Sequence, residues 1–271
     1  MTRSKAGNIS TKSVRDYWRH VSEKFLGGTL QSHVVKCARG YYGDFEIIDH
    51  TYQQLVHEDP ALARWDRFLH AQDAPVALRN RKTYFLSLLA GHMTRMKGTR
   101  LEVLNIGSGP GRDILEWFEK HGRTSVHFEC VDIDPEAIAH AKALLTRFSD
   151  GVAFHQLNAL RFSTQRKYQL VWSGGLFDYL PDGLFVRLLK RLLRFTAPGG
   201  EVVIGNFSKE HPTRAYMELF GGWLLIHRSP EELQQLALNV GVKDSAVKIE
   251  SEPSGVNLFL HVRKETRCPP L

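Results

Sequence analysis

Short apolar segments alternate with amphipathic segments from residue 101 onward, and this alternation limits the fold more than any other feature of the chain. Runs such as LEVLNI and YQLVWS are typical of buried strands, whereas the segments between such runs repeat apolar residues every three or four positions, as helices do. Strands that alternate with helices form a parallel sheet with helices on both faces. The last two strands have only SEPSG between them and must pair antiparallel.

The same patterns divide the chain into two parts. We expect residues 1–100 to form a helical cap, because ALARWDRFLHAQ and NRKTYFLSLLAGHMTRM are amphipathic and no strand-like alternation occurs there. Within the cap, residues 38–49 are expected to form an aromatic-rich loop, and the polar, basic residues 1–13 a frayed tail. Residues 101–271 are expected to form the α/β core.

The core is expected to hold seven strands and four helices. Ser229, Pro230 and Glu232 have the spacing of a capping box, which predicts where the last helix begins. The expected strands lie at 101–106, 126–134, 152–157, 168–173, 197–207, 242–250 and 255–262, and the expected helices at 111–122, 135–148, 181–196 and 229–241.

The composition of the chain limits which classes of partner and which cellular compartment we expect. The 271 residues are 42% apolar, which is enough for a core. The net charge of +7 is compatible with nucleic acid, but lysine and arginine are spread along the sequence, so nucleic acid is not the favoured partner. No apolar run approaches the ~20 residues of a membrane helix, so no membrane partner is expected. Three scattered cysteines argue against a disulfide framework or a zinc site and favour the cytoplasm.

Three glycines at every second position, Gly107, Gly109 and Gly111, follow the first expected strand and precede a helix. A turn that needs positive φ would account for them on structural grounds alone. Their place at the carboxyl end of a strand, with Asp132 at the end of the next strand, favours a nucleotide whose ribose hydroxyls bind the acid. A dinucleotide site usually has a third glycine where this chain has Arg112, so S-adenosylmethionine is the favoured ligand.

With these residues the chain resembles the class I S-adenosylmethionine-dependent methyltransferases. The resemblance covers residues from about 101 to the end, and VLNIGSGPGRD, VDIDP, HQLNAL, APGG and the terminal hairpin carry it. It implies a Rossmann-like, seven-stranded, mostly parallel sheet. It also implies that Asp132 holds the ribose, that Ile133 packs on adenine, and that Asn158, where the family usually has Asp, contacts the adenine amino group. Asn105 departs as well, since an acid is commoner there, and this leaves open how the methionine end is held.

A narrower resemblance involves motifs outside the sheet. It is to a bacterial methyltransferase group associated with 3-hydroxy fatty acid methyl ester (extracellular factor) signals. These motifs lie in both halves of the chain, which implies that the helical layer and the core work as one unit. The motifs are RGYYGDFEIID, ALRNRK, GGLFDYL, GNF and TRAYMELFGGWLLIHR.

Aromatic and basic side chains of the cap are predicted to complete the cofactor site. Tyr41 and Tyr42 could close over the sulfonium as a lid, or could simply pack in a loop. Arg81, in preference to Arg79, could pair with the methionine carboxylate, or could lie on a solvated helix face. The predicted cofactor-binding residues are Gly107, Ser108, Gly109, Gly111, Asp132, Ile133, Asn158, Ala159, Ser173, Tyr42 and Arg81.

The methyl acceptor is expected near the ends of the fourth and fifth strands. Asp178 could act as a base or could cap a helix. His227 and Arg228 could clamp an acidic group, although a lone histidine is more often structural, and His211 is a further candidate base. The predicted catalytic residues are Asp178, Glu218, His227 and Arg228. The predicted substrate-binding residues are Tyr41, Phe177, Tyr179, Asn206, Phe207, Tyr216 and Trp223, and the alternative for Phe177 and Tyr179 is helix–sheet packing.

Methyl transfer to an oxygen or nitrogen of a small molecule is therefore the expected activity. Placing the acceptor in line supplies much of the catalysis, and only a hydroxyl or protonated amine acceptor needs a base. No metal is expected, and the protein is expected to be a monomer or homodimer. Three other activities stay open: an RNA- or protein-directed methyltransferase, which the pI of about 9.3 favours, a cofactor-binding scaffold, and a dehydrogenase.

Overall fold

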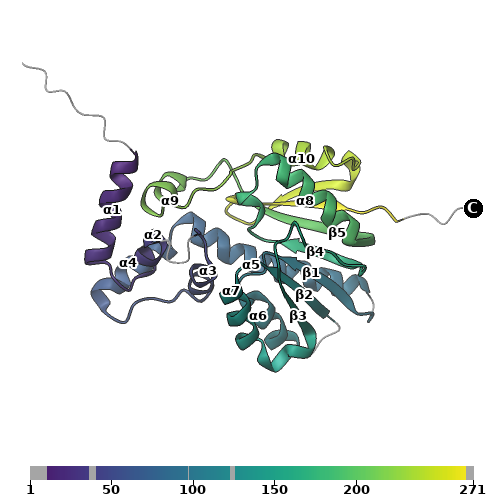
Figure 1. Ribbon diagram of the computed structural model, residues 1–271, viewed down its shortest axis with the longest axis horizontal. Helices are drawn as coiled ribbons and strands as arrows, with labels where there is room; N and C mark the ends of the chain where they lie inside the picture. Colours follow the sequence, from purple (N-terminus) through teal and green to yellow (C-terminus); the bar gives the residue numbers. More distant parts are fainter. Residues whose placement is uncertain (1–10, 37–40, 97, 123–125, 267–271) are drawn as a thin grey trace, which may run out of the picture. The chain divides into compact units, whose positions relative to one another are not determined.

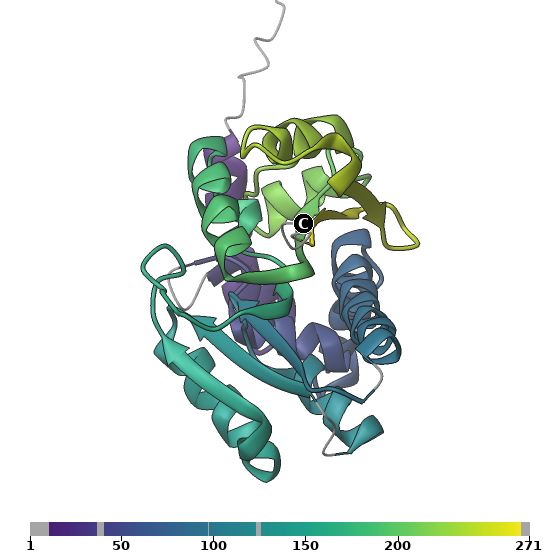
Figure 2. The ribbon, with the colours of Figure 1, turned by 90° about the vertical axis from the view of Figure 1, so that its right-hand side faces the viewer.

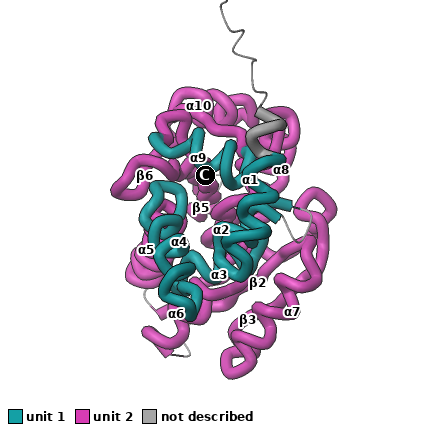
Figure 3. The backbone as a smooth tube through the Cα atoms, turned by 90° about the vertical axis from the view of Figure 1, so that its left-hand side faces the viewer, with its two compact units in different colours: residues 1–75, 212–224 teal, residues 76–211, 225–271 magenta. Residues whose placement is uncertain are grey.

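The computed structural model describes residues 11–36, 41–96, 98–122 and 126–266, and it forms two compact units. Unit 1 comprises Met1–Pro75 with Pro212–Leu224, and unit 2 comprises Val76–His211 with Leu225–Leu271 (Figure 3). Along the chain, the first boundary between the two units thus falls near residue 75, whereas the sequence patterns predicted a boundary near residue 100. Most of the predicted N-terminal tail and residues 38–40 of the predicted loop lie outside the described residues.

Unit 2 is built on a seven-stranded sheet in the order β3-β2-β1-β4-β5-β7-β6. The first five strands pair in parallel, and β7 pairs antiparallel with both β5 and β6. This confirms the predicted Rossmann-like sheet with its terminal hairpin. The strand order reverses between β1 and β4, the position where such sheets bind ligands beyond their carboxyl ends. The strands are β1 Leu101–Ile106, β2 Val126–Asp132, β3 Val152–Gln156, β4 Tyr168–Ser173, β5 Thr196–Phe207, β6 Val247–Ser251 and β7 Asn257–Arg263.

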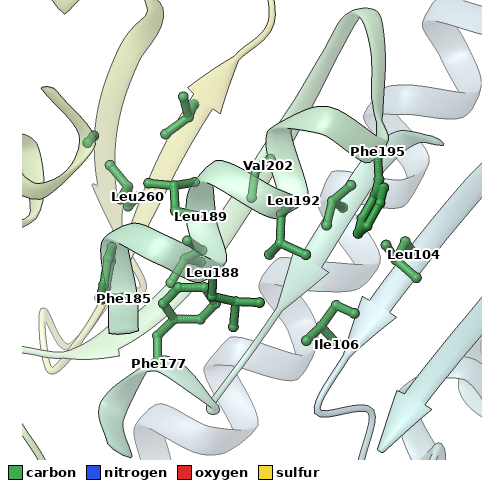
Figure 4. Packing of buried hydrophobic residues seen from close by; sticks show 14 of the residues in the cluster. Leu104, Ile106, Phe177, Phe185, Leu188, Leu189, Leu192, Phe195, Val202 and Leu260 are labelled. Carbon is green, nitrogen blue, oxygen red and sulfur yellow. The ribbon is translucent and has the colours of Figure 1, made fainter. Parts of the chain in front are cut away.

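Helices cover both faces of this sheet. On one face α8 and α10 cover apolar side chains of the strands, and Figure 4 shows Leu188, Leu189 and Leu192 of α8 packed in this cluster. On the other face α5 and α6 contribute Phe85 and Trp117 to a second cluster. Figures 1 and 2 show α5 in blue and α8 in green on opposite sides of the strands. The helices are α5 Asp73–Met96, α6 Arg112–His121, α7 Pro135–Leu144, α8 Asp182–Phe195 and α10 Pro230–Leu238.

Two local features near the end of unit 2 compare directly with the sequence patterns. The predicted capping box is present: Ser229 Oγ accepts a hydrogen bond from the Glu232 N–H, and the Glu232 carboxylate accepts one from the Ser229 N–H. The strand expected from residue 242 begins only at Val247, because Asp244–Ala246 form a short 3-10 helix. A polar Lys-Asp-Ser stretch favours such a turn over a strand.

Unit 1 is helical in its described residues, but part of one predicted loop is a helix. Residues Phe45–Gln53 form α3, so the expectation of a loop over 38–49 is wrong for its second half. Asp44 is the cause: its carboxylate accepts hydrogen bonds from the backbone N–H groups of Glu46 and Ile47, both at 3.0 Å, and caps the helix. The helices are α1 Thr11–Phe25, α2 Leu30–Lys36, α3 Phe45–Gln53, α4 Pro60–His70 and α9 Arg214–Phe220.

Two further expectations concern the membrane and the cysteines. In the described parts of the chain, no helix combines the length and the apolar character needed to cross a bilayer. Cys130 is fully buried in the core of unit 2, where it packs as a small apolar residue, and Cys37 and Cys268 lie outside the described residues.

Candidate active site

The glycine loop after β1 adopts the conformation that its spacing predicts. Gly107, Gly109 and Gly111 have φ values of 67°, 59° and 72°, which favour glycine. A Cβ at Gly107 would lie 3.1 Å from Leu176, and one at Gly111 would lie 3.2 Å from Ala141, so both glycines also permit close packing. A Cβ at Gly109 would meet nothing within 4 Å. Gly109 is therefore the point where a ligand can approach the backbone.

Asp132 closes this loop from the end of β2. Its two carboxylate oxygens accept hydrogen bonds from the N–H groups of Gly109 at 2.8 Å and Asp134 at 3.0 Å. Burial raises the pKa of Asp132, and these backbone N–H groups oppose that shift. Each oxygen keeps a second lone pair that can accept from a ribose hydroxyl. Beside it, Ile133 is 64% exposed, which leaves an apolar surface next to the acid.

Four other predicted cofactor residues have mainly structural contacts. Asn158 is exposed, and its side-chain oxygen accepts from the Leu160 N–H at 2.8 Å, as in an Asx-turn, so only its second lone pair could meet an amino group. Ser173 is fully buried and donates to the Ile106 carbonyl at 2.9 Å, which ties β4 to β1. Ala159 packs against the core, while Ser108 is buried within the loop itself.

Arg81 lies against the backbone that follows β4. Its Nη1 donates to the Gly174 carbonyl at 3.0 Å, and the side chain is only 7% exposed. A Cβ at Gly175 would lie 2.8 Å from the same Nη1, so the glycine pair makes room for the guanidinium. Burial raises the pKa of two acids, Asp113 and Asp178, and the charge of Arg81 opposes that shift in both. Arg81 therefore does not lie on a solvated helix face, which was the alternative to a carboxylate-binding role.

Asp178 is a buried acid whose hydrogen bonds differ from those of a helix cap. One carboxylate oxygen accepts from the Phe207 N–H at 2.7 Å, and the side chain precedes no helix N-terminus that it caps. Burial raises the pKa of Asp178 to about 7, although the Phe207 N–H, Arg81 and Arg228 act in the opposite direction. A carboxyl with this pKa can take up and release a proton near neutral pH.

Arg228 is engaged on every side by protein groups. The guanidinium is 2% exposed and lies 4.8 Å from the centre of the Phe185 ring. Nη1 donates to the Phe177 carbonyl and to Asn206 Oδ1, and Nη2 donates to the Leu180 carbonyl and to Asp182. The Nε–H also donates to Asp182. These contacts use all five N–H donors, so Arg228 fastens the segment after β4 to the end of β5 rather than offering a clamp to a substrate.

Asn206, predicted to bind substrate, belongs to the same hydrogen-bond network as Arg228. Its amide nitrogen donates to the carbonyls of Phe207 and Ile226, both at 3.0 Å, and its oxygen accepts from Arg228. Phe207 itself is 1% exposed. The geometry therefore gives Asn206 a hydrogen-bonding role and Phe207 a packing role, both within the protein.

Two histidines lie close together beyond β5. His211 and His227 are each 6% exposed, and their ring centres are 5.8 Å apart. The Phe207 ring stacks on His211 at 5.6 Å. His227 Nδ1 lies 3.1 Å from the Leu225 carbonyl, which favours the tautomer with the proton on Nδ1 and the lone pair on Nε2. In that tautomer His227 can accept a proton.

The two aromatic residues after β4 separate into a core and a surface position. Phe177 is fully buried and packs edge-on against Phe185, as Figure 4 shows. Tyr179 is 39% exposed. Of this pair, only Tyr179 has a ring that a substrate could reach without a rearrangement of the core.

The remaining candidates lie in unit 1. Tyr42 packs against Gly222, where a Cβ would come within 3.1 Å of the ring, and Tyr41 is 39% exposed. The Tyr216 hydroxyl donates to Gln31, and Glu218 accepts from Arg214 at 2.6 Å in an i,i+4 pair. With that partner Glu218 acts as a helix-stabilising acid.

Unit 1 also contains an apolar cavity of about 30 Å³, room for roughly one water molecule. Trp223, which is 8% exposed, contributes to its wall, as does Tyr216. Trp223 thus borders an apolar space, which in this structure holds no more than about one water molecule.

A group of three possible metal ligands joins α2 to α3 in unit 1. His33 Nε2 lies 3.1 Å from Asp44 Oδ2 and 3.5 Å from Glu46 Oε2. It is the one His/Cys/Asp/Glu group of this kind in the parts of the chain that the structure describes. The N-capping role of Asp44 and these imidazole–carboxylate contacts account for the group without a metal.

Asn257 is a residue that the sequence patterns did not single out. It is fully buried at the start of β7, and neither its amide oxygen nor its amide nitrogen has a hydrogen-bond partner among the described residues. A Cβ at Gly205 would lie 3.4 Å from this oxygen and 2.3 Å from the Gly174 carbonyl. The amide thus lies near the carbonyl that Arg81 binds. No local pattern marks it, because only the antiparallel pairing of Phe207 with Asn257 brings it there.

Comparisons with known proteins agree with this geometry. Residues 103–200 match the family model described as a methyltransferase domain, just over a third of the chain. No curated protein matches the chain in sequence.

Solved structures share the fold at low identity. A protein of Bordetella parapertussis described as a possible exported protein has 18% identity and a TM-score of 0.70, over 98% of this chain and 100% of its own. Magnesium protoporphyrin IX methyltransferase from Synechocystis PCC 6803 with bound S-adenosylmethionine has 12% identity and a TM-score of 0.53, over 82% and 98%. A Burkholderia thailandensis N1-methyltransferase of 1,6-didemethyltoxoflavin has 19% identity and a TM-score of 0.50, over 68% and 78%. The chain thus has the Rossmann-like fold of these methyltransferase structures, and its residues 103–200 match the methyltransferase-domain model.

Proposed function

We propose that this protein is an S-adenosylmethionine-dependent methyltransferase that methylates an oxygen or nitrogen atom of a small molecule. The observation that carries the proposal is the open backbone at Gly109 beside Asp132 and the exposed Ile133, at the point where the strand order reverses. The methyltransferase-domain match over residues 103–200 supports it. So do structural neighbours of the same fold that were crystallised with S-adenosylmethionine or its product.

The residues present fit such a cofactor. Asp132 would accept hydrogen bonds from the ribose hydroxyls, Ile133 would cover one face of the adenine, and Gly109 would let the ligand approach the loop backbone. Arg81, with its charge at the end of β4, would face the methionine carboxylate. When bound, the cofactor supplies a methyl group activated by its sulfonium.

On the acceptor side, the buried acid Asp178 favours an acceptor that must lose a proton. A pKa of about 7 matches a base that works near neutral pH. His227 offers a second basic nitrogen, and the N–H of the preceding residue, Ile226, donates to the Asp178 carbonyl at 2.7 Å. The Asn257 side chain would hydrogen-bond the hydroxyl or amine of the acceptor, with its amide N–H as donor or its amide oxygen as acceptor. Such a partner would offset the free energy that it costs to bury both groups unpaired. A hydroxyl or amine therefore fits better than a carboxylate, which would need a cationic clamp that Arg228 cannot supply.

A screen for S-adenosylhomocysteine formation tests this function. The purified protein is offered classes of hydroxyl-, amine- and carboxylate-bearing metabolites, with 3-hydroxy fatty acids included because of the narrower family resemblance. We expect turnover with a hydroxyl or amine class, together with calorimetric binding of S-adenosylmethionine and none of NAD. Binding of NAD instead would identify a dehydrogenase. Cofactor binding with no turnover of any class would identify a scaffold.

The pH dependence of stability gives a test of Asp178 that needs no substrate. Because the folded pKa of about 7 lies above the ordinary value of 3.8, the unfolded chain loses this proton first. The stability that Asp178 contributes is therefore complete below about pH 4 and is lost as the pH rises towards about 7. Relative to the wild type, Asp178→Asn should gain on the order of 2–4 kcal/mol of unfolding free energy between pH 4 and pH 8. Urea unfolding at several pH values measures this, and a constant difference would contradict the buried, protonated acid.

A further inference from the structure

Seven basic residues lie on two neighbouring segments of unit 2, the loop 159–167 and α8. The segment from residue 157 to residue 195 contains only two acids, and neither offsets this charge: Asp178 is buried, and Asp182 pairs with Arg228. The seven side chains, called here the α8 basic surface, are Arg161, Arg166, Lys167, Arg187, Lys190, Arg191 and Arg194. Their separation along the chain is why the sequence alone suggested dispersed charge.

Hydrogen bonds hold the loop and the helix together as one surface. Lys167 Nζ donates to the Arg194 carbonyl at 2.7 Å, and Arg191 donates to the Phe162 carbonyl. Both bonds join a loop residue to the C-terminal half of α8. The charges of the loop therefore stay next to those of the helix.

The helix presents its charges in a single row. Arg187, Lys190 and Arg194 are exposed and fall within an arc of about 60° over about 10 Å of helix. Leu188 and Leu192 on the other side of α8 are buried in the core, as Figure 4 shows, so the helix cannot turn to hide the row. The row is thus a fixed, outward-facing feature of the fold.

Most of these charges have no acid to pair with. Among the described residues, Arg161, Lys167, Arg187, Lys190 and Arg194 make no ion pair, and Arg166 only approaches Glu129 at 3.5 Å. Exposed cations elsewhere in the chain do pair, for example Lys243 with Glu265 and Arg100 with Glu102. Natural surfaces usually intersperse the two signs, so an unpaired group of this size points to an anionic surface as its partner.

We propose that the α8 basic surface docks on an anionic lipid bilayer. A bilayer engages all of these charges at once without needing a matched spacing, and each Lys or Arg near an anionic membrane raises affinity by about fivefold. Leu184, 36% exposed on the first turn of α8, adds an apolar contact at the edge of the surface. Single-stranded nucleic acid is the weaker fit, because none of the residues between 159 and 167 or along α8 offers an exposed aromatic ring for stacking. The proposal does not depend on the methyltransferase assignment.

Vesicle co-sedimentation tests it with the whole protein. Large vesicles of about 30% phosphatidylglycerol in phosphatidylcholine should pellet the wild type at about 0.1 M salt, and vesicles of phosphatidylcholine alone should not. At about 0.5 M salt the binding should fall at least about tenfold. The triple variant Arg187→Glu, Lys190→Glu, Arg194→Glu should lose at least about tenfold in vesicle affinity.

A matched variant separates this surface from total charge. Arg67→Glu, Lys120→Glu, Lys142→Glu changes the net charge by the same amount at exposed positions elsewhere, and it should keep most of the binding, with at most about a threefold loss. If the triple Glu variant does not fold, the neutral variant Arg187→Gln, Lys190→Gln, Arg194→Gln takes its place in the same comparison. Equal losses in the two triples, equal binding to phosphatidylcholine, or tighter binding to a duplex RNA through the same three residues would each overturn the proposal.

Discussion

Replacing Asp132 by alanine is expected to raise the dissociation constant for S-adenosylmethionine at least about tenfold. The carboxylate lies at the end of β2 with a lone pair left on each oxygen, and charge-assisted hydrogen bonds to two ribose hydroxyls would be lost together. Alanine also removes the acceptor for the Gly109 N–H, which loosens the loop that the ligand approaches. Calorimetric titration of the two proteins with S-adenosylmethionine measures the change.

Asp134→Ala is the matched control for that experiment. Asp134 caps α7 by accepting from the Glu136 N–H at 2.8 Å, so its loss should cost about 1 kcal/mol of stability. Its own backbone N–H still donates to Asp132, and the cofactor dissociation constant should therefore stay within about twofold. An unchanged constant in Asp132→Ala would remove the cofactor assignment, whereas equal losses in both variants would point to the turn rather than to the carboxylate.

The parts of this molecule that the sequence predicted well depend on local patterns. Strands and helices from residue 101 onward follow hydrophobic periodicity, and the loop at Gly107–Gly111 follows from glycine spacing, so each could be found without knowing its neighbours. The helix α3 was not predicted although its local signal, Asp44 as a capping residue, is present, because the glycine- and tyrosine-rich residues before Asp44 are typical of a loop.

The parts that the sequence did not predict depend on contacts between distant residues. Arg228 and Asn206 have the residue types of a substrate clamp, but the partners that use their hydrogen bonds come from the segment after β4. Asn257 reaches the end of β5 only through antiparallel pairing. The α8 basic surface arises in the same way, since a loop and a helix bring together charges up to 33 positions apart, from Arg161 to Arg194. Residue type suggests chemistry, and the fold decides whether that chemistry is available.

Arg228→Ala is expected to lower the free energy of unfolding by about 3–5 kcal/mol. The substitution leaves the Phe177 and Leu180 carbonyls and Asn206 without the donor that satisfies them, in a region that is almost entirely buried. The contact with Asp182 adds little, because that carboxylate is 71% exposed and well screened. Urea unfolding followed by circular dichroism measures the loss.

Arg187→Ala on the exposed row of α8 is the control for that measurement, and it should change stability by no more than about 0.5 kcal/mol. Arg228→Met adds a second comparison, since it keeps the packing against Phe185 but removes every donor, and it should recover only part of the loss. An Arg228→Ala variant with the urea midpoint of the wild type but no methyl transfer would contradict this role. Arg228 would then be a substrate clamp and not a residue that holds the two backbone segments together. The buried hydrogen bonds instead predict a lower urea midpoint. Any activity lost in Arg228→Ala should then be proportional to the fraction of the protein that is unfolded.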